Sequence, residues 1–530
     1  MRFPYVFSLV AAAVFASLPV AQASTLIYCS EASPAGFDPA QYTSGTEFDA
    51  AAETLFNRLV QFKRGGTELE PGLATAWEAS ADGKTYTFHL RPGVKFHTTA
   101  YFTPGRDFNA DDVLFTFERM LHKEQPFRQA YPTEFPYFTD MGLDQNIAAV
   151  KKLDDMTVVF TLKQTDAAFA ADLAMSFASI QSAEYAAQLL KAGHPEQLNQ
   201  QPIGTGPFVF SRYQKDAVIR YKANTGYWKP EDVKLDELIF AITPDAATRL
   251  QKLKADECQV SGYARPADLV EMKKDPRLKV LEQPGFNVGF LAYNTQHPPL
   301  DKPEVRRALD MAINKQAIVD TVFQGAGQVA RNVMPPTQWS YDPRIKGTAY
   351  DPQQARQLLA AAGVKPGTTL NLWAMTVQRA SNPNARLSAQ MIQQDWAKVG
   401  IKANIVSYEW GEYIKRAKAG EHDVMTYGWT GDNGDPDNWL GVLFGCSAIG
   451  GSNYARWCDK GLDSLLQRAK TLTDREARIP LYEQAQRIIH EQVPVSPMAH
   501  SVVSQPMSTR VDGFKINPFG VTGFYGVSLR

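Results

Sequence analysis

Three carboxylates crowd into one short segment of the chain. The segment MTYGWTGDNGDPDNW, residues 425–439, holds Asp432, Asp435 and Asp437 between apolar stretches. Carboxylates grouped in this way can hold a metal ion, carry out acid–base chemistry or pair with the cation of a ligand. A carboxylate beside apolar side chains is costly unless a cation or hydrogen-bond donors accompany it. The segment therefore predicts a positive partner, whose nature depends on the rest of the chain.

Metal binding does not fit the spacing of the segment. A calcium loop follows the pattern D-x-[DN]-x-[DN]-G with Glu at position twelve. Counted from Asp432, position three is Gly434, position five is Pro436 and position twelve is Leu443. The eight histidines of the chain form no i, i+4 pair, and no Cys/His zinc spacing occurs. We therefore expect no metal site and no cofactor.

Hydrolytic chemistry has no anchor in the sequence. The chain contains no GxSxG, HExxH or SxxK motif, each of which marks a family of hydrolases. Carboxylates without a nucleophile or a metal motif do not define a reaction. A ligand ammonium is a suitable partner for a partly packed carboxylate, so we expect a binding protein without catalytic residues. A secreted peptidase, which would turn over a bound peptide, is the alternative from another class.

The bulk properties indicate an exported protein with several lobes. At 530 residues the chain is too long for one hydrophobic core, which predicts two or three lobes. A net charge of −1 provides no basic field for nucleic acid. Residues 1–23 are typical of a secretory signal peptide, with Arg2, an apolar run and the cleavage site Ala21-Gln22-Ala23. No cysteine stands at that site, so we expect cleavage after Ala23 and a soluble exported protein.

Strand and helix signals alternate along the chain, as in α/β proteins. Residues 85–90 alternate apolar and polar side chains after an Asp-Gly turn, which predicts a half-buried strand. Residues 151–162 indicate a hairpin. Asn109 is a predicted helix cap, and a further helix is expected to begin at Pro352 and to end before Gly363.

The C-terminal part contains two further helix signals. Residues 385–399 carry an apolar stripe at helical spacing. Thr473 and Glu476 match a capping box, which predicts the start of another helix. Pro480 then falls inside that helix, where a proline costs about 3 kcal/mol. We expect the helix either to begin at Pro480 or to kink there.

Two strand-like segments are candidates for crossovers between lobes. They are residues 281–294, LEQPGFNVGFLAYN, and residues 499–506, AHSVVSQP. Two strands that join two lobes make a hinge, and a hinge allows the lobes to close around a ligand.

The four cysteines predict disulfides. An even number of cysteines in an oxidising compartment suggests two bonds, and four cysteines allow three pairings. Cys446 and Cys458 are close in sequence, so a local bond between them is plausible, which would leave Cys29 and Cys258 as the second pair.

Several long motifs occur together in an order that is similar to a known family. The chain resembles the dipeptide-binding members of the extracellular solute-binding family for peptides and nickel, which serve bacterial ABC importers. The resemblance runs from Thr25 nearly to the C-terminus. It rests on the motifs YCSEASPAGFDPAQYTSGT (28–46), DGKTYTFHLRPGVKFH (82–97), NADDVLFTFER (109–119), PIGTGPF (202–208), NPNAR (382–386), YEWGEYIKRAKAGEH (408–422) and GWTGDNGDPDNW (428–439).

The resemblance implies a fold and a function. The implied fold is an α/β periplasmic-binding-protein fold of the large class II, cluster C type, with two lobes, a hinge and an additional subdomain in lobe 1. Lobe 1 would comprise residues 24–284 and 502–530, and lobe 2 residues 285–501. The implied function is capture of dipeptides or short peptides in a buried cleft between the lobes and delivery to an inner-membrane ABC permease. The resemblance also implies the pairs Cys29–Cys258 and Cys446–Cys458.

The resemblance further assigns the ligand site, residue by residue. Thr43, Ser44 and Gly45 correspond to a loop that touches the peptide backbone. Arg379 corresponds to the arginine that takes the C-terminal carboxylate of the peptide. The wall that takes the peptide ammonium corresponds to Trp429, Thr430, Gly431 and Asp432, with Asp432 as the counter-ion. Asp435 and Asp437 are expected to support this loop through turn and backbone hydrogen bonds.

One position departs from the dipeptide-binding pattern. Where those proteins have Pro-Tyr after the arginine, this chain has Ala380-Ser381, so a bulky aromatic wall is replaced by small side chains. Both residues are expected to line the pocket, and the change admits a larger ligand, such as a longer peptide, glutathione or haem. A chemoreceptor is a further candidate partner, and we expect a monomer.

Overall fold

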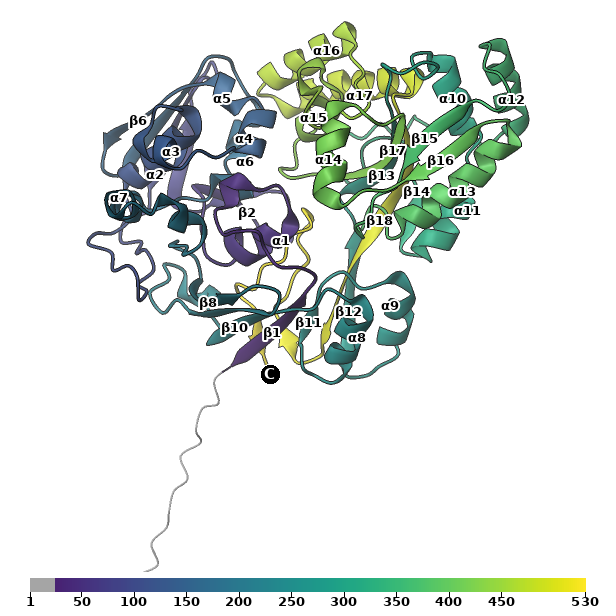
Figure 1. Ribbon diagram of the computed structural model, residues 1–530. Coiled ribbons are helices and arrows are strands. Elements are labelled where there is room, and N and C mark those ends of the chain that lie inside the picture. Colours follow the sequence, from purple (N-terminus) through teal and green to yellow (C-terminus); the bar gives the residue numbers. More distant parts are fainter. Residues whose placement is uncertain (1–23) are drawn as a thin grey trace, which may run out of the picture.

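The structure is a computed structural model, and it describes residues 24–530, except for the side chains of residues 410 and 411. The predicted signal peptide lies outside the described residues. Two lobes stand beside each other and share strands near their base (Figure 1). We call lobe 1 the body that contains strand β1, and lobe 2 the body that contains strand β17. No helix in the described part of the chain is long and apolar enough to cross a membrane.

The base of lobe 1 is a mixed sheet around β1. Strand β1 is parallel to both of its neighbours, β10 and β11, and the sheet continues through antiparallel strands β9 and β8. Alternating apolar residues of β1 are fully buried, which explains its central position. The elements are β1 (Thr25–Ser30), β8 (Phe208–Gln214), β9 (Val218–Ala223), β10 (Glu237–Ile242), β11 (Val260–Ser261), α8 (Ala246–Lys254), α9 (Pro266–Met272), β19 (Val511–Asp512) and β20 (Ser528–Leu529).

A separate four-stranded antiparallel sheet forms the additional subdomain of lobe 1. Its strand order is β4-β5-β7-β6, and it contains the predicted strand at 85–90 and the predicted hairpin. Asn109 caps α2 as expected, in a capping box with Asp112. The elements of this part are β2 (Val60–Phe62), β3 (Leu69–Pro71), β4 (Ala74–Ala79), β5 (Thr85–Leu90), β6 (Ile147–Asp154), β7 (Thr157–Leu162), α1 (Gly45–Glu47), α2 (Ala110–Leu121), α3 (Pro126–Ala130), α4 (Pro136–Asp140), α5 (Leu143–Asn146), α6 (Phe169–Asp172) and α7 (Ala183–Ala192).

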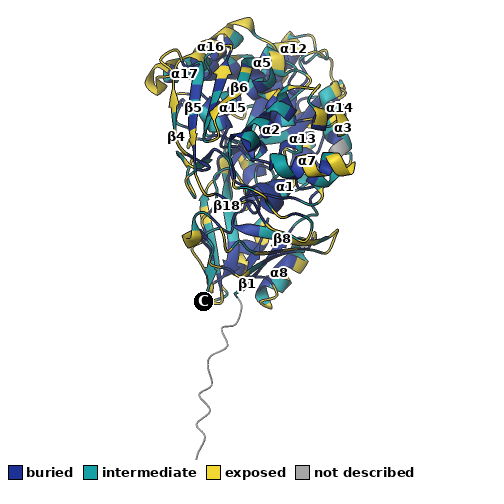
Figure 2. Ribbon diagram, turned by 90° about the vertical axis from the view of Figure 1, so that its left-hand side faces the viewer, coloured by how far each residue is buried: buried dark blue, intermediate teal, exposed yellow. Residues whose placement is uncertain are grey.

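Lobe 2 is a sheet in the order β16-β15-β17-β13-β18 with helices around it. Its strands bury mainly apolar side chains. Over the molecule as a whole, exposed residues gather on outer helices and turns (Figure 2). The elements are β13 (Asn287–Tyr293), β14 (Gly327–Val329), β15 (Thr369–Trp373), β16 (Lys402–Val406), β17 (Val424–Thr430), β18 (Val495–Ser508), α10 (Pro303–Met311), α11 (Lys315–Ile318), α12 (Pro352–Ala361), α13 (Ala385–Lys398), α14 (Trp410–Ala419), α15 (Asp437–Phe444), α16 (Lys460–Thr471) and α17 (Arg475–Gln492).

Both predicted crossover segments are strands. Strand β12 (Leu278–Pro284) belongs to lobe 1 and leads after two residues into β13 of lobe 2. Strand β18 pairs with β13 up to Ala499 and with β12 from Val502 onward. One continuous strand therefore takes part in the sheets of both lobes, which is the arrangement that a two-stranded hinge requires.

The helix predictions in the C-terminal part need one correction. The helices at Pro352 and at 385–399 are confirmed, and Gly363 adopts the left-handed conformation that ends the first of them. The predicted cap at Thr473 is wrong. Asp474 caps α17 instead, because its side chain accepts a hydrogen bond from the backbone N–H of Glu476 at 3.2 Å. The helix begins at Arg475 and continues through Pro480.

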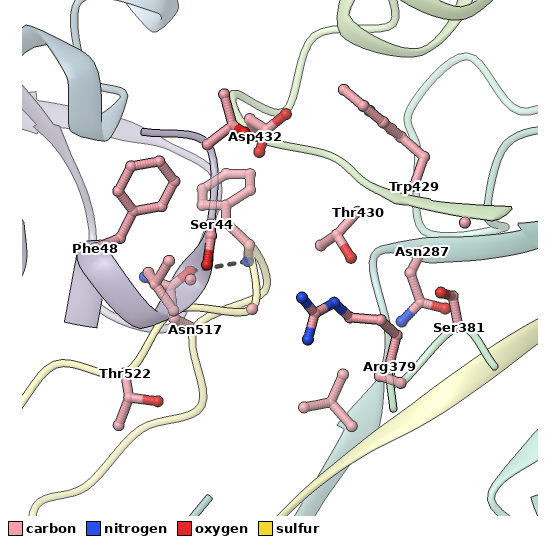
Figure 3. Close-up of a pocket in the computed structure, with 18 of the residues that line it drawn as sticks. Ser44, Phe48, Asn287, Arg379, Ser381, Trp429, Thr430, Asp432, Asn517 and Thr522 are labelled. Atoms are coloured by element: carbon pink, nitrogen blue, oxygen red, sulfur yellow. Dashed lines mark hydrogen bonds between the residues drawn. The ribbon is translucent and has the colours of Figure 1, made fainter. Parts of the chain in front are cut away.

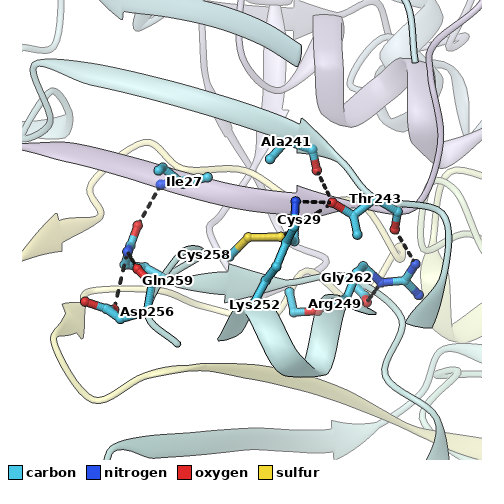
Figure 4. Close-up of a disulfide and its surroundings, with 11 residues drawn as sticks. Ile27, Cys29, Ala241, Thr243, Arg249, Lys252, Asp256, Cys258, Gln259 and Gly262 are labelled. Carbon is cyan, nitrogen blue, oxygen red and sulfur yellow. Dashed lines mark hydrogen bonds between the residues drawn. A yellow bond between two sulfur atoms is a disulfide. The ribbon is translucent and has the colours of Figure 1, made fainter. Parts of the chain in front are cut away.

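The structure contains both disulfides that the resemblance implies. Cys29 of β1 pairs with Cys258, which lies between α8 and β11, with Cα atoms 5.8 Å apart (Figure 4). Cys446 pairs with Cys458 across a short loop, with Cα atoms 4.7 Å apart. The first bond ties the N-terminal strand to a segment distant in sequence and thus restricts the unfolded chain more than the second.

Candidate functional site

A cavity of about 440 Å³ lies between the two lobes. Nine of the ten residues predicted for the ligand site line it, and both lobes contribute to them. They are Thr43, Ser44, Gly45, Arg379, Ala380, Ser381, Trp429, Thr430 and Asp432. The tenth, Gly431, is not among the residues that line the cavity.

Gly431 has a positioning role at the end of β17. A Cβ atom on this residue would lie 2.3 Å from the ring of Phe286 and 2.8 Å from Nε1 of Trp439. Its backbone N–H donates a hydrogen bond to the carbonyl of Phe286 at 2.9 Å. The absence of a side chain thus lets the strand end pack closely on Phe286, and this packing fixes where Thr430 and Asp432 enter the cavity.

Two of the three clustered carboxylates have a cation from the protein itself. Asp435 accepts two hydrogen bonds from Arg478, at 2.7 and 2.8 Å, and both residues are buried. Asp435 also accepts from the backbone N–H of Asp437 at 3.0 Å, as expected of a loop-supporting residue. The side chain of Asp437 forms an ion pair with Lys470 at 3.3 Å, a partner that the sequence did not reveal.

Asp432 differs from its two neighbours in having no cation. Its Oδ1 accepts a hydrogen bond from the hydroxyl of Tyr137 at 2.8 Å. Its Oδ2 is shielded from solvent and has no hydrogen-bond partner, and no basic side chain among the described residues forms an ion pair with it. Burial raises the pKa of Asp432 to about 7, although the hydrogen bond from Tyr137 and the side chain of Asn438 oppose the rise. This carboxylate is therefore desolvated without a counter-ion.

The loop that holds Asp432 is fixed by Asn438. The side-chain oxygen of Asn438 accepts hydrogen bonds from the backbone N–H of Asp432 at 2.9 Å and from Nε1 of Trp429 at 3.2 Å. One buried amide thus joins the start of α15 to the end of β17. Its position keeps the carboxylate of Asp432 and the ring of Trp429 on the same wall of the cavity (Figure 3).

Arg379 extends from a tight turn after β15. Backbone hydrogen bonds between Arg379 and Asn382, at 3.4 and 3.1 Å, close the turn. Figure 3 shows the guanidinium in the pocket, apart from the carboxylate of Asp432. Burial raises the pKa of Tyr263 in lobe 1, and the positive charge of Arg379 opposes that rise, so this charge acts across the cavity. One cationic and one anionic group therefore face a common space.

Ser381 packs against the sheet of lobe 2. It is buried, and a Cβ atom on Gly428 would lie 2.1 Å from its hydroxyl oxygen. A Cβ atom on Gly289 would lie 2.1 Å from its carbonyl oxygen. Two glycines on adjacent strands thus admit this turn, and Ala380 and Ser381 together leave a wall of small side chains beside Arg379.

Sequence reasoning missed Tyr137 and Asn438. Asn438 lies within the acidic segment, but no motif marked its side chain as the acceptor of the backbone N–H of Asp432. Tyr137 is 295 residues away from Asp432 in sequence and comes from the other lobe. No local pattern marks such a residue, because only the packing of the two lobes brings it to the carboxylate.

Comparison with known proteins agrees with this arrangement. The family described as "Bacterial extracellular solute-binding proteins, family 5 Middle" matches residues 68–451. The chain belongs to family 5 of the bacterial extracellular solute-binding proteins. This membership confirms the predicted family, a binding protein rather than an enzyme, and the two-lobed α/β fold.

The similarity to individual relatives covers nearly the whole of this chain, the solute-binding protein. It is 66% identical over 522 residues to "Di/tripeptide-binding protein 1" of Pseudomonas aeruginosa strain UCBPP-PA14, covering 98% of this chain and 97% of that one. It is 50% identical over 506 residues to "Heme-binding protein A" of Haemophilus influenzae, covering 96% and 92%. The dipeptide-binding protein of Pseudoalteromonas sp. SM9913 in complex with Met-Leu has a TM-score of 0.90 and 39% identity, covering 96% and 100%.

Proposed function

We propose that this protein binds dipeptides and related short peptides in the cavity between its lobes and delivers them to an ABC permease of the inner membrane. The observation that carries this proposal is the carboxylate of Asp432, which is buried with one oxygen unpartnered and without a cation. Its neighbours Asp435 and Asp437 both pair with basic side chains of the protein. A peptide ammonium supplies the missing charge and the missing hydrogen-bond donor.

The second anchor is the guanidinium of Arg379. A guanidinium matches a carboxylate with two parallel hydrogen bonds, so it suits the C-terminus of a peptide. A zwitterionic peptide carries one cation and one anion, and two fixed anchors of opposite charge select ligands by the separation of these ends. An unpaired buried charge costs roughly 3–5 kcal/mol, so a blocked terminus should be rejected at either anchor.

The remaining wall supports binding of varied peptides. Thr43, Ser44 and Gly45 of lobe 1 and Thr430 of lobe 2 face the cavity with small side chains and backbone groups. Hydrogen bonds to the backbone of an extended ligand provide affinity that does not depend on the ligand's side chains. The protein would therefore recognise the two charged ends of the peptide and tolerate different side chains along it.

Peptides longer than two residues belong to the proposed ligand class. Ala380 and Ser381 leave small side chains beside Arg379, and a relative with 66% identity is named as a di/tripeptide-binding protein. Haem and glutathione are the alternative ligands. The relative named as a haem-binding protein, at 50% identity, supports haem as an alternative. The residues described around the cavity include tyrosines and methionines, which can also bind haem iron, so the preference for peptides over haem rests on the two charged anchors Asp432 and Arg379.

The lobe boundaries and the cellular setting belong to the same proposal. We assign residues 24–284 and 502–530 to lobe 1 and residues 285–501 to lobe 2, since β12, β13 and β18 join the two sheets near these positions. The mature chain would begin after Ala23 and act in the periplasm as a monomer. A chemoreceptor is a second candidate partner beside the permease.

Calorimetric titration of the unfolded and refolded mature protein tests the proposal, because refolding removes any ligand that copurifies. The ligands are Ala-Leu, Ala-Ala-Leu, N-acetyl-Ala-Leu, Ala-Leu-amide, glutathione and haem. The proposal predicts tight binding of the free peptides and loss of binding when either end is blocked. Binding of haem or glutathione without binding of free peptides would contradict it and would leave the family assignment intact.

A further inference from the structure

A buried polar cluster joins the two lobes beside the cavity. Lobe 1 contributes Asp166, which precedes helix α6, and Asp172, the last residue of that helix. Lobe 2 contributes Asn433 and Asp437 from the acidic segment and Lys470 from α16. We call these five residues the inter-lobe cluster. None of them is among the residues that line the cavity, so a bound ligand does not touch them.

Three contacts of the cluster cross from one lobe to the other. Asn433 donates a side-chain hydrogen bond to Asp172 at 2.6 Å. The ammonium of Lys470 lies 3.3 Å from Asp166. The backbone N–H of residue 167 donates to the carbonyl of Lys470 at 2.8 Å. Lys470 also lies 3.3 Å from Asp437 of its own lobe, so one ammonium stands between carboxylates of both lobes.

The cluster is physically connected to the ligand site. Asn433 follows Asp432 directly, and its side-chain oxygen accepts the backbone N–H of Asp435 at 2.9 Å. Asp435 is held in turn by Arg478. The same short loop thus presents Asp432 to the cavity on one side and Asn433 and Asp437 to lobe 1 on the other. Closing of the lobes at the cluster brings the Asp432 loop up to Tyr137.

The charges of the cluster do not balance. Three carboxylates share one ammonium, and Asp166 and Asp172 are almost completely buried. Burial, together with neighbouring carboxylates, raises the pKa of Asp172 well above its ordinary value, and burial also raises that of Asp166, against the opposing effect of Lys470. Burial lowers the pKa of Lys470, but Asp437 and Asp166 outweigh it and raise the pKa.

The titratable groups around the cluster come from each element packed on it. Tyr86 of β5 donates to the carbonyl of Asp166, and Asp166 and Asp172 contribute to the rise of its pKa, which is mainly due to burial, to about 12. Arg478 and Tyr482 of α17 contact each other beside the loop that carries Asp435, and the charge of Arg478 is neutralised by Asp435. The excess negative charge is therefore confined to Asp166, Asp172 and Asp437.

We propose that the inter-lobe cluster is a proton-linked closing contact, which sets the fraction of closed protein and thereby the affinity for the ligand. In the open form, water solvates the three carboxylates and the ammonium. Closure removes this water, so the closed form binds a proton that the open form does not hold near neutral pH. For a ligand that binds only the closed form, the apparent association constant is the intrinsic one multiplied by the fraction of ligand-free protein that is closed.

Two substitutions have opposite predicted effects. Lys470→Met leaves three carboxylates without an ammonium and opposes closure. Asp172→Asn removes one carboxylate, keeps an oxygen that accepts from Asn433 and favours closure. Since coupling between remote sites typically changes affinity about 5–150-fold, we expect Kd for Ala-Leu to rise about tenfold or more in the first variant and to fall in the second. Lys460→Met, an exposed lysine of the same helix, and Asp107→Asn, an exposed carboxylate of lobe 1, are the matched controls.

The sign of the pH effect follows from the direction of the shift. A carboxyl whose pKa is raised on closure favours the closed form at low pH and loses this contribution as the pH rises through the raised pKa. Titrations in two buffers of different ionisation enthalpy, at pH 6, 7 and 8, give the number of protons taken up on binding. We expect Asp172→Asn to take up fewer protons than the wild type, whereas the two control variants should match the wild type.

Small-angle X-ray scattering without ligand separates this inference from the peptide-binding function on which it rests. We expect a larger radius of gyration for Lys470→Met than for the wild type, and a smaller one for Asp172→Asn. Circular dichroism checks that each variant is folded. If peptides bind but neither the affinity, the proton uptake nor the radius differs between these variants and the controls, the closing role is overturned. If no peptide binds and the radii differ as expected, the peptide proposal alone fails.

Discussion

The hydroxyl of Tyr137 in lobe 1 donates a hydrogen bond of 2.8 Å to the carboxylate of Asp432 in lobe 2. This contact spans the two lobes at the proposed ammonium site. It satisfies one oxygen of a carboxylate whose other oxygen has no partner. The Tyr137 side chain thus joins the two lobes and also orients the carboxylate toward a ligand cation. The affinity for the ligand should therefore depend on this hydrogen bond.

Tyr137→Phe should weaken peptide binding without unfolding the protein. A hydrogen bond to a charged group contributes about 1.5–3 kcal/mol, so we expect Kd for a free dipeptide to rise roughly ten- to hundredfold. Tyr131→Phe is the control, since Tyr131 lies outside the cavity and its hydroxyl makes a long contact of 3.5 Å with Gln41. Equal affinities of the two variants in calorimetry would argue against a role of Tyr137 in binding.

The pH dependence of binding should reveal the carboxyl of Asp432. Its pKa is raised to about 7 by burial, and an ammonium needs the ionised form. Below about pH 7 the carboxyl is protonated, so the association constant for a dipeptide should fall by up to about tenfold for each unit of pH. The Asp172→Asn background removes a carboxyl of the inter-lobe cluster whose pKa is raised well above its ordinary value and whose effect on binding has the opposite sign.

The control for this pH profile is the double variant Asp432→Asn with Asp172→Asn. It lacks the carboxyl that titrates in the cavity, so its affinity should be weak and nearly constant between pH 6 and 7, below the pKa of about 7.7–8.0 of the peptide's own α-amino group. A slope that persists in the double variant would assign the titration to another group.

Ser381→Tyr should shift the preference from tripeptides toward dipeptides. The serine hydroxyl lies against Gly428, so a tyrosine cannot occupy the same space and has to turn toward the cavity. The ratio of the Kd for Ala-Ala-Leu to that for Ala-Leu is expected to increase at least about tenfold, the effect of roughly 1.4 kcal/mol. Ser381→Ala keeps the wall small and should leave this ratio unchanged. An unchanged ratio in the tyrosine variant would show that this turn does not limit ligand length.

Arg478→Met should destabilise lobe 2. It leaves Asp435 buried without its cation, and breaking one partner of a buried ion pair costs roughly 3–5 kcal/mol. Arg475→Met on the same helix is the control, because Arg475 is exposed and stacks on the ring of Trp339 at 4.7 Å. Urea unfolding should show a marked loss for the first variant and a change of about 1 kcal/mol or less for the second. Similar midpoints would mean that the Asp435 pair contributes little to stability.

The sequence predicted those parts of the fold that local patterns determine. The alternation at 85–90, the cap at Asn109 and the end of a helix at Gly363 each depend on neighbouring residues. The cap of α17 was misplaced by one residue, because Thr473 and Asp474 both suit that position and the choice depends on where the chain enters the helix. The resemblance, rather than any local pattern, indicated the two lobes and the residues of the site.

Partners that come from distant parts of the chain could not be predicted. The acidic segment indicated a need for cations, but not that Arg478 and Lys470 supply two of them. Their spacing from Asp435 and Asp437 follows from how α16 and α17 pack on the loop. Tyr137 and Asp172 reach the segment only across the interface between the lobes.

A cycle of two ligands and two proteins tests the central claim most directly, namely that Asp432 is the counter-ion of the peptide ammonium. Calorimetry measures Kd of Ala-Leu and N-acetyl-Ala-Leu for the wild type and for Asp432→Asn. The claim predicts that acetylation costs the wild type roughly 3 kcal/mol or more and costs the variant little, because the two changes remove the same interaction. If acetylation weakens binding to Asp432→Asn as much as to the wild type, another group of the cavity holds the ammonium.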